Sequence, residues 1–395
     1  MNTSASQRIQ SIDILRGLVM VIMALDHVRD FLHNDAMLHD PLDLKTTTPI
    51  LFFTRWITHF CAPIFVFLSG LSAGLAGQKR SRAQTSSFLI KRGLWLVAVE
   101  VVLITLALSL NPLYNMVFFQ VIWAIGISMI ILGLLLRISN KIILPLGLLL
   151  IVGHDALQYL PQPKNVVSTA LLNILFTARF YIIPLPGNHF LAFLYAVLPW
   201  TGIMLLGYAV SAWYVNESHQ KNRRLALSIT GFLLLIAFIL LRSAIGYGDP
   251  SPYVSQRNIT GSVLAFLNVS KYPPSLQYTC LMLSFGFIFL AVTENSHNRL
   301  ANLFKVYGKV PFFYYVPHFY LIRIVTIVVF FASGYTVKNI ISPNIPFLFR
   351  PATMGFSLGV TYLFWIGIVA LLYWPCKWFA GYKQRHRGKW WASYV

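Results

Sequence analysis

Residues 11–33 read SIDILRGLVMVIMALDHVRDFLH, a long apolar run whose second half carries several ionisable side chains. About 20 predominantly apolar residues are enough to span a bilayer as an α-helix. Ionisable groups inside a membrane are costly, so they are retained mainly for pairing or for function. The stretch therefore predicts a transmembrane helix with one end at a polar, functional site.

The composition extends this interpretation to the whole chain. Of 395 residues, 57% are hydrophobic and 11% are charged, whereas a soluble domain carries about 25% charged residues. Long apolar runs recur throughout, so we expect one transmembrane domain over 1–395, an all-α polytopic helix bundle of about ten helices. The expected helices cover 12–32, 57–77, 93–111, 115–136, 142–160, 189–214, 224–245, 276–294, 308–331 and 355–378.

The chain is strongly basic, with a formal net charge of +20. In a polytopic membrane protein such an excess reflects basic cytoplasmic loops. We do not expect nucleic acid as a partner, because the bases gather on no soluble domain. When ten helices cross the membrane in alternation, most of the Lys and Arg residues outside the helices fall on the side that holds both termini. Since basic loops are cytoplasmic, this predicts that both termini are cytoplasmic. The tail 379–395 mixes bases with tryptophan and suits a cytoplasmic membrane surface rich in anionic lipid.

Polar side chains concentrate toward the outer side of this predicted topology. His27, Asp30 and His33 lie in the outer half of the first helix, and His39 lies in the loop that follows. Further polar residues expected on that side are His59, His154, Asp155 and His189. These positions predict a polar site, or at least a polar face, built from several helices.

Histidine acts as a base near neutral pH, and an adjacent carboxylate can fix its tautomer. Asp30 follows His27 by one helical turn and shares its face, whereas Asp26 points about 100° away. We therefore expect Asp30 to orient His27, unless an acid from another helix does so.

One stripe of the first helix connects its two ends. At about 100° per residue, Arg16 and His27 fall within about 20° of the same direction, with Met20 and Met23 between them. This stripe suits the wall of a channel, because it has a cation at its cytoplasmic end and an imidazole further along. In the alternative interpretation Arg16 reaches the lipid headgroups, His27 is a buried histidine with its hydrogen bonds satisfied, and the methionines fill the core.

The ninth expected helix contains KVYGKVPFFYYVPHFYLIRI, residues 305–324. Lys309 lies near its cytoplasmic end and His318 at about mid-depth. Pro311 and Pro317 are expected to break or kink it and to free backbone carbonyls. The alternative is an aromatic packing helix with a hydrogen-bonded His318.

Several classes of site have no support in the sequence. Signatures of serine hydrolases, zincins, P-loop proteins and dinucleotide-binding folds are missing from the sequence. Cys61, Cys280 and Cys376 are far apart, so we expect neither a disulfide framework nor a metal site.

Three stretches resemble a known family. SIDILRGLVMVIMALDHVRDF, HFCAPIFVFLSGLSAG with the basic loop after it, and FKVYGKVPFFYYVPHFYLIRI are similar to prokaryotic relatives of heparan-alpha-glucosaminide N-acetyltransferase. The opening also resembles the acyltransferase-3 family, in which an arginine-glycine pair starts the first helix and a histidine follows the glycine by ten residues. Gly17 and His27 have that spacing.

The resemblance implies transfer of an acyl group across a membrane. Acetyl-CoA would bind from the cytoplasm, and its acetyl group would reach an amine or hydroxyl of a glycan or glycolipid on the outer side. Arg16, Arg92 and Lys309 would meet the CoA phosphates, and Met20 with Met23 would accommodate the pantetheine arm. The small residues of the second helix are expected to let a neighbouring helix approach closely, with a role beside pantetheine as the alternative. The expected location is the inner membrane of a bacterium.

The identity of the catalytic base stays open. In the heparan enzyme the essential histidine lies in the luminal loop after the first helix, and an asparagine stands where this chain has His27. The loop here offers His33 and His39. The resemblance to the acyltransferase-3 family favours His27, which would deprotonate the acceptor or carry the acetyl group itself.

Two other classes of protein remain alternatives. A transporter or lipid flippase with a proton-linked His/Asp site would also keep intramembrane charges and broken helices, but it would have pseudosymmetric halves. A non-catalytic membrane partner would have every polar group satisfied and no tunnel. Membrane lipids are expected neighbours, and homo-oligomerisation stays open.

Overall fold

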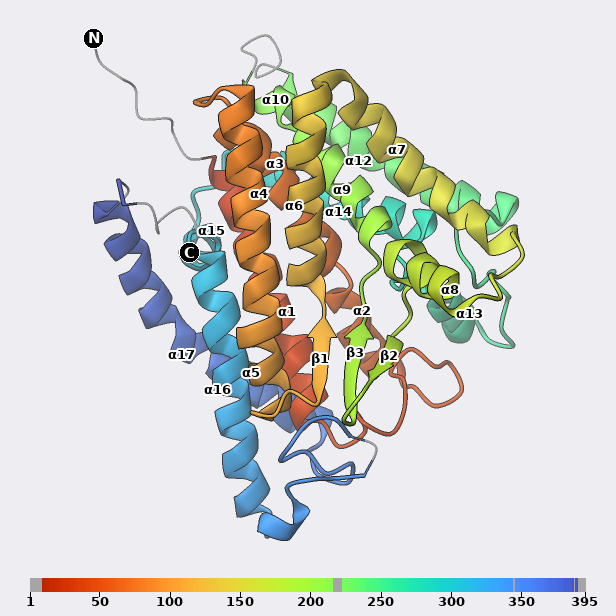
Figure 1. Cartoon of the computed structure of the whole chain (residues 1–395), viewed down its shortest axis with the longest axis vertical. Helices are drawn as coiled ribbons and strands as arrows, with labels where there is room; N and C mark the ends of the chain where they lie inside the picture. Colours follow the sequence, from red (N-terminus) through yellow and green to blue (C-terminus); the bar gives the residue numbers. More distant parts are fainter. Residues whose placement is uncertain (1–8, 216–221, 344, 387, 390–395) are drawn as a thin grey trace.

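The computed structural model describes residues 9–215, 222–343, 345–386 and 388–389. Within these residues the chain is mostly helical, and eight helices are long and apolar enough to cross a membrane (Figure 1). The predicted all-α polytopic bundle is therefore confirmed. The eight spans are Pro49–Gly77, Arg82–Ser109, Val121–Ile138, Asn140–Tyr159, Arg223–Ile245, Leu276–Thr293, Pro311–Ala332 and Leu358–Arg385.

The elements follow one another along the chain with short connections in most places. The α-helices are α1 (Gln10–Leu32), α2 (Pro49–Thr58), α3 (Cys61–Gly77), α4 (Arg82–Val99), α5 (Thr105–Ser109), α6 (Val121–Ile138), α7 (Ile143–Gly153), α8 (Val166–Leu172), α9 (Val197–Val210), α10 (Ala212–Val215), α12 (Arg223–Leu240), α13 (Ile259–Leu267), α14 (Leu276–Thr293), α15 (Arg299–Gly308), α16 (Pro311–Ala332) and α17 (Leu358–Arg385). Shorter turns of 3-10 or π helix are η1 (Glu100–Ile104), η2 (Asn140–Ile142), η3 (His154–Tyr159), η4 (Asn173–Thr177), η5 (Leu241–Ile245) and η6 (Val337–Asn339).

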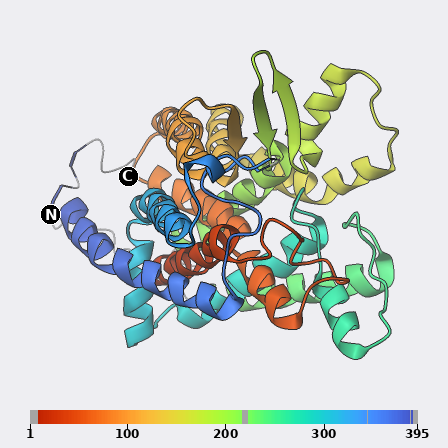
Figure 2. The same ribbon diagram turned by 90° about the horizontal axis from the view of Figure 1, so that it is seen from below.

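Helix α1 lies at the centre of the bundle and packs against α15, α16, α17, α3, α14 and α2. Figure 2 shows it, in red, between α16 and α17 in blue. It carries more charge than a lipid-facing span tolerates, and its Asp13, Asp26 and Arg29 are buried inside the protein instead. Helix α9 is only 14 residues long. With α1 and α9, the eight spans account for the ten predicted helices.

Small residues bring α3 and α9 into close contact, as the sequence predicts. A Cβ atom added at Gly70 would lie 2.0 Å from the Met204 carbonyl oxygen. One added at Gly207 would lie 2.0 Å from the Phe67 carbonyl oxygen. The two backbones therefore touch, which larger side chains at these positions would prevent.

Two helices begin earlier than predicted. The stretch expected as an outer loop over 33–56 contains α2, where the Thr48 side chain accepts from the Leu51 backbone and Pro49 occupies the first turn. Helix α4 begins at Arg82 rather than at 93, because Ser81 and Gln84 form a capping box. Both starts carry ordinary N-cap signals that the apolar periodicity alone does not reveal.

A small sheet replaces the predicted beginnings of two helices. Residues 115–119 and 189–193, expected as helical, contribute β1 (Met116–Phe119) and β3 (His189–Phe193), and β2 (Tyr181–Leu185) completes the order β1-β3-β2. Strand β3 pairs in parallel with β1 and antiparallel with β2. The reason is that short apolar, aromatic runs suit either element, while Gly187 and Asn188 take positive φ values that turn the chain into a hairpin.

The end of the chain differs from prediction in two ways. The ninth helix is two helices, α15 and α16, with Lys309 in the connection. Pro311 starts α16 instead of breaking it, and Pro317 lies within α16. Helix α17 continues to Arg385, so the predicted tail 379–395 begins as helix, and its residues 387 and 390–395 lie outside the described residues.

Residues 345–357 cover the His27 end of α1. The Phe356 backbone donates to the Leu32 carbonyl, and His33 forms a β-bridge with Phe356. At the opposite end, Lys383 of α17 lines the same cavity as Arg16 of α1. The start of α1 and the end of α17 therefore lie at one end of the bundle, as an even number of crossings requires.

Candidate functional site

The stripe predicted on α1 lines two cavities, one after the other. Arg16 and Met20 line a cavity of about 410 Å³, and Met23 and His27 line a second of about 250 Å³. We name them the basic cavity and the histidine cavity. Helical spacing alone is enough to place all four side chains toward one channel, because they belong to a single helix.

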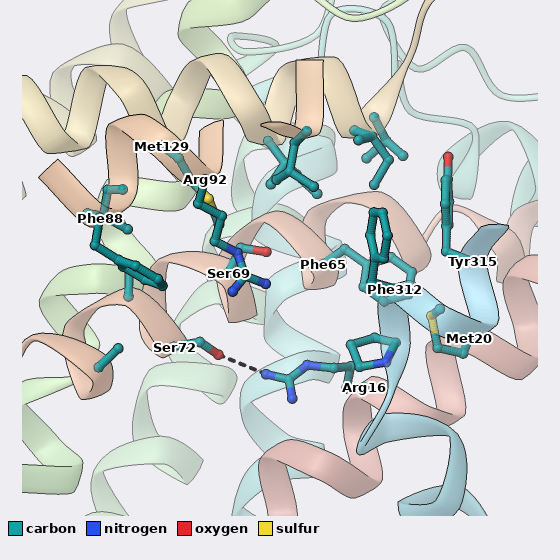
Figure 3. A pocket seen from close by; sticks show the side chains of 18 of the residues that line it. Arg16, Met20, Phe65, Ser69, Ser72, Phe88, Arg92, Met129, Phe312 and Tyr315 are labelled. Carbon is teal, nitrogen blue, oxygen red and sulfur yellow. Dashed lines mark hydrogen bonds between the residues drawn. The ribbon is translucent and has the colours of Figure 1, made fainter. Parts of the chain in front are cut away.

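The basic cavity collects cations from five separate elements. Its lining includes Arg16, Arg80, Arg92, Lys309 and Lys383, and no carboxylate occurs among its described lining residues. Figure 3 shows Arg16 beside Phe312 and Met20, with its guanidinium directed to Ser72, and Arg92 on the other side of the cavity from Tyr315. Such a mixture of several cations and apolar walls fits a ligand with an anionic head and an apolar arm.

Arg16 is positioned by the crossing of α1 and α15. A Cβ atom added at Gly17 would lie 1.8 Å from the Phe304 carbonyl oxygen, and one added at Gly308 would lie 1.8 Å from the Asp13 carbonyl oxygen. Because both residues are glycine, the helices touch, and Arg16 Nη1 donates to the Gly308 carbonyl at 3.3 Å. Arg16 Nη2 also donates to Ser72 Oγ on α3 at 2.8 Å (Figure 3). The same crossing brings Lys309 beside the cavity.

The histidine cavity is lined by both acids and bases. Its lining residues are Met23, Asp26, His27, Asp30, Phe31, Met37, Arg55, Thr58, Cys61, Ala62, Phe65, Leu108, Gln120, Val121, Leu194, Tyr195, Lys271, Tyr272, Tyr315 and Phe347. Asp26 forms ion pairs with Arg55 of α2 and with Arg29, and Arg29 also bonds to Asp30 at 2.6 Å. The two carboxylates are therefore held by arginines.

The imidazole of His27 is free of hydrogen bonds to the part of the chain that the structure describes. It packs against the His318 ring at 5.3 Å and the Phe319 ring at 4.3 Å, between centroids. The expected orientation by Asp30 is not seen, because Arg29 takes that carboxylate. His318 bonds through Nδ1 to the Tyr315 carbonyl, and its Nε2 has no partner among the described residues. The ring nitrogens of His27 can thus meet a ligand in the cavity.

The two cavities meet at a shared seam. Phe65 of α3, Val121 of α6 and Tyr315 of α16 line both of them. Together with the α1 stripe, these residues link the linings of the two cavities between Arg16 and His27. We use the name seam for Phe65, Val121 and Tyr315 below.

The other predicted histidines lie away from this route. His39 is half exposed and pairs with Asp35 at 2.8 Å. His33 is buried against Arg350 and Phe356, and its Nδ1 accepts from the Asp35 backbone. Burial, Arg29 and Arg350 lower the pKa of His33. Six residues predicted on the outer side are not among the described lining residues of the histidine cavity: His33, His39, His59, His154, Asp155 and His189.

Several lining residues were not predicted as site residues. Arg55 lies on α2, near the predicted loop boundary, and Lys271 and Tyr272 lie between α13 and α14. Lys271 is buried and stands over the Tyr272 ring at 5.1 Å. Burial would raise the pKa of Tyr272, but Lys271 and Arg55 outweigh it and bring that pKa below its usual value. The helix-start signal of Thr48 followed by Pro49 predicts α2 from the sequence. No local sequence signal indicates that Lys271 lines the cavity.

Comparison with protein families finds a match to "Heparan-alpha-glucosaminide N-acetyltransferase, catalytic" over residues 8–247, more than half of the chain. The chain belongs to this family. It is accordingly a multi-pass integral membrane protein of an acetyltransferase family, and the resemblance noted in the sequence is confirmed. A comparison with curated proteins found no match. The family match covers α1 to α12, so it includes Arg16, Arg92 and His27, while Lys309 and His318 lie beyond it.

Proposed function

We propose that the protein transfers an acetyl group from acetyl-CoA to an amine or hydroxyl of a glycan or glycolipid. The donor occupies the basic cavity from the cytoplasm, and the acceptor occupies the histidine cavity from the outer side. The observation that carries this proposal is the continuous stripe on α1, from Arg16 through Met20 and Met23 to His27, along two cavities that meet at the seam.

Charge supports the choice of donor. The CoA head carries a diphosphate and a 3′-phosphate, and arginine and lysine are the usual partners of phosphate groups. The basic cavity supplies such groups from α1, α4, α17 and the segments next to α4 and α16. The pantetheine arm is uncharged and fits the apolar half of the cavity, beside Met20 and Phe312.

The reaction then takes place near the seam. His27 accepts the proton of the acceptor amine or hydroxyl, whose lone pair attacks the thioester carbonyl carbon. A C–N or C–O bond forms, the C–S bond breaks, and the departing CoA thiolate takes up the proton. Acetyl-CoA and acceptor become acetylated acceptor and free CoA, with no other reactant. Asp26, with Arg55 and Arg29, would keep the cavity polar enough for a hydroxylated acceptor.

The two alternatives are less well supported. The family match favours a transferase over a transporter or flippase. A non-catalytic partner would leave no cavities and no unpaired groups, yet the described residues enclose two cavities and leave His318 Nε2 without a hydrogen bond. The location proposed for the protein is a bacterial inner membrane, with lipids around the bundle.

The first test is acetyl-CoA consumption by the purified protein in proteoliposomes, with water as the default acceptor. We expect His27→Ala to lower the rate at least about 100-fold, the range for loss of a general base, while acetyl-CoA still binds. His39→Ala is the matched control and should keep the wild-type rate. If only His39→Ala is inactive, the base lies in the loop. If wild type neither binds nor consumes acetyl-CoA, the proposed function is wrong.

A further inference from the structure

Tyr315 is the polar member of the seam. Phe65 and Val121 have apolar side chains, so among the three shared lining residues only Tyr315 has a side chain that can donate a hydrogen bond. Its side chain is 4% exposed, and its hydroxyl has no hydrogen-bond partner among the described residues. A buried hydroxyl without a partner is unfavourable, and in native proteins it calls for an explanation such as a catalytic role or a ligand.

The surroundings of Tyr315 tie it to the candidate base. Its backbone carbonyl accepts from His318 Nδ1, and the His318 ring lies 5.3 Å from that of His27. In Figure 3 Tyr315 stands with Met20 at the end of the basic cavity away from Ser72 and Arg92. A donor whose head meets the arginines and whose thioester approaches His27 must therefore bring its thioester past Tyr315.

We propose that the Tyr315 hydroxyl donates a hydrogen bond to the thioester carbonyl oxygen of the donor. This inference rests on the proposed function. When the acceptor attacks the carbonyl carbon, the electron pair of the C=O bond moves to the oxygen, and the O–H of Tyr315 stabilises that charge without giving up its proton. The carbonyl re-forms as the C–S bond breaks. Tyr315 is then a catalytic residue that acts beside His27.

Other candidate donors are less suited. Arg55 is engaged by Asp26, and Lys271 lines only the histidine cavity. Arg16 is already hydrogen-bonded to the Gly308 carbonyl and to Ser72 Oγ. A fixed donor in a cavity shielded from water is worth more than one in water, because it needs no reorganisation during the reaction.

The chain provides a matched control one residue away. The Tyr314 hydroxyl is also buried and has no hydrogen-bond partner among the described residues, but Tyr314 lines neither cavity. Tyr315→Phe and Tyr314→Phe each remove one such hydroxyl and keep the ring. Neither should lower the melting temperature, because neither hydroxyl has a hydrogen bond within the described part of the chain that the substitution would break.

The experiment measures acetyl-CoA turnover, acetyl-CoA binding and thermal unfolding of both variants. We expect Tyr315→Phe to lower kcat by about 10²- to 10³-fold, as for loss of an oxyanion donor, with binding and melting temperature unchanged. Tyr314→Phe should keep the wild-type kcat. A Tyr315→Phe rate within about twofold of wild type, or an equal loss in both variants, would overturn the inference while leaving the proposed function standing. A wild type without turnover would reject both.

Discussion

His33 couples the stability of the protein to pH. Its Nδ1 accepts a hydrogen bond from the Asp35 backbone at 3.3 Å, which requires a neutral ring. Burial lowers its pKa, Arg29 and Arg350 lower it further, and the Asp35 carboxylate opposes these effects without cancelling them. The unfolded chain therefore binds a proton more readily than the folded chain at this position. The contribution of His33 to stability is complete above the ordinary histidine pKa of about 6.5 and is lost as the pH falls below it.

We predict that His33→Asn reduces the acid sensitivity of the fold. Asparagine can accept the same backbone hydrogen bond and does not titrate. Thermal unfolding in detergent from pH 7.5 to 5.5 should show a smaller fall in melting temperature for His33→Asn than for wild type. The exposed His297, changed to Asn, serves as the control and should retain the wild-type pH dependence. Equal pH dependence in all three proteins would contradict the prediction.

At individual positions, sequence reasoning works best inside one helix. Arg16, Met20, Met23 and His27 all line the cavities, because their alignment depends only on helical geometry. The partner of His27 could not be predicted in the same way. Asp30 has the right spacing, but Arg29 competes for its carboxylate, and a charged pair is the stronger interaction. Arg29 is the sequence neighbour of Asp30, so this competition is local, and helical spacing alone does not reveal it.

The crossing of α1 and α15 connects the fold to the basic cavity. Gly17 and Gly308 contact the partner backbone, and each is adjacent to a cation of the cavity, Arg16 and Lys309. A side chain at either glycine would push the helices apart and move the cation away from its position.

We predict that Gly17→Ala lowers the free energy of unfolding by about 1–3 kcal/mol, the range for overpacking. We also expect it to weaken acetyl-CoA binding. Gly367→Ala in α17 is the control, because an added Cβ atom there meets nothing within 4 Å. It should be neutral or stabilising by up to about 1 kcal/mol. Thermal unfolding and donor binding measure both effects. The packing argument fails if Gly17→Ala behaves like Gly367→Ala.

Whole elements were predicted with uneven success, for physical reasons. Long apolar runs give the spans, because membrane thickness fixes their length. Short runs such as 116–119 and 189–193 satisfy both helix and strand patterns, and only pairing between distant segments decides for the sheet. Helix starts at Ser81 and Thr48 carry local cap signals, so they can be found from the sequence. The position of Lys271 depends on how α13 and α14 are joined, and no local signal reveals it.

The bundle as a whole separates two chemical environments. One end collects five cations around a cavity, and the other holds His27 among ion pairs. The even number of crossings brings the start of α1 and the end of α17 to the basic end. If the basic end is cytoplasmic, as the charge distribution predicts, the proposed donor and acceptor would meet the protein from opposite sides of the membrane.

That arrangement can be measured with proteoliposomes that hold the protein in a known orientation, the basic end outward. Labelled acetyl-CoA, which does not cross the bilayer, is added outside, and glucosamine as a probe amine is placed either inside or outside. We predict labelled product from glucosamine trapped inside, none from glucosamine outside, and loss of product with His27→Ala. Product formed only when acetyl-CoA and glucosamine share the same compartment would contradict transfer through the two cavities.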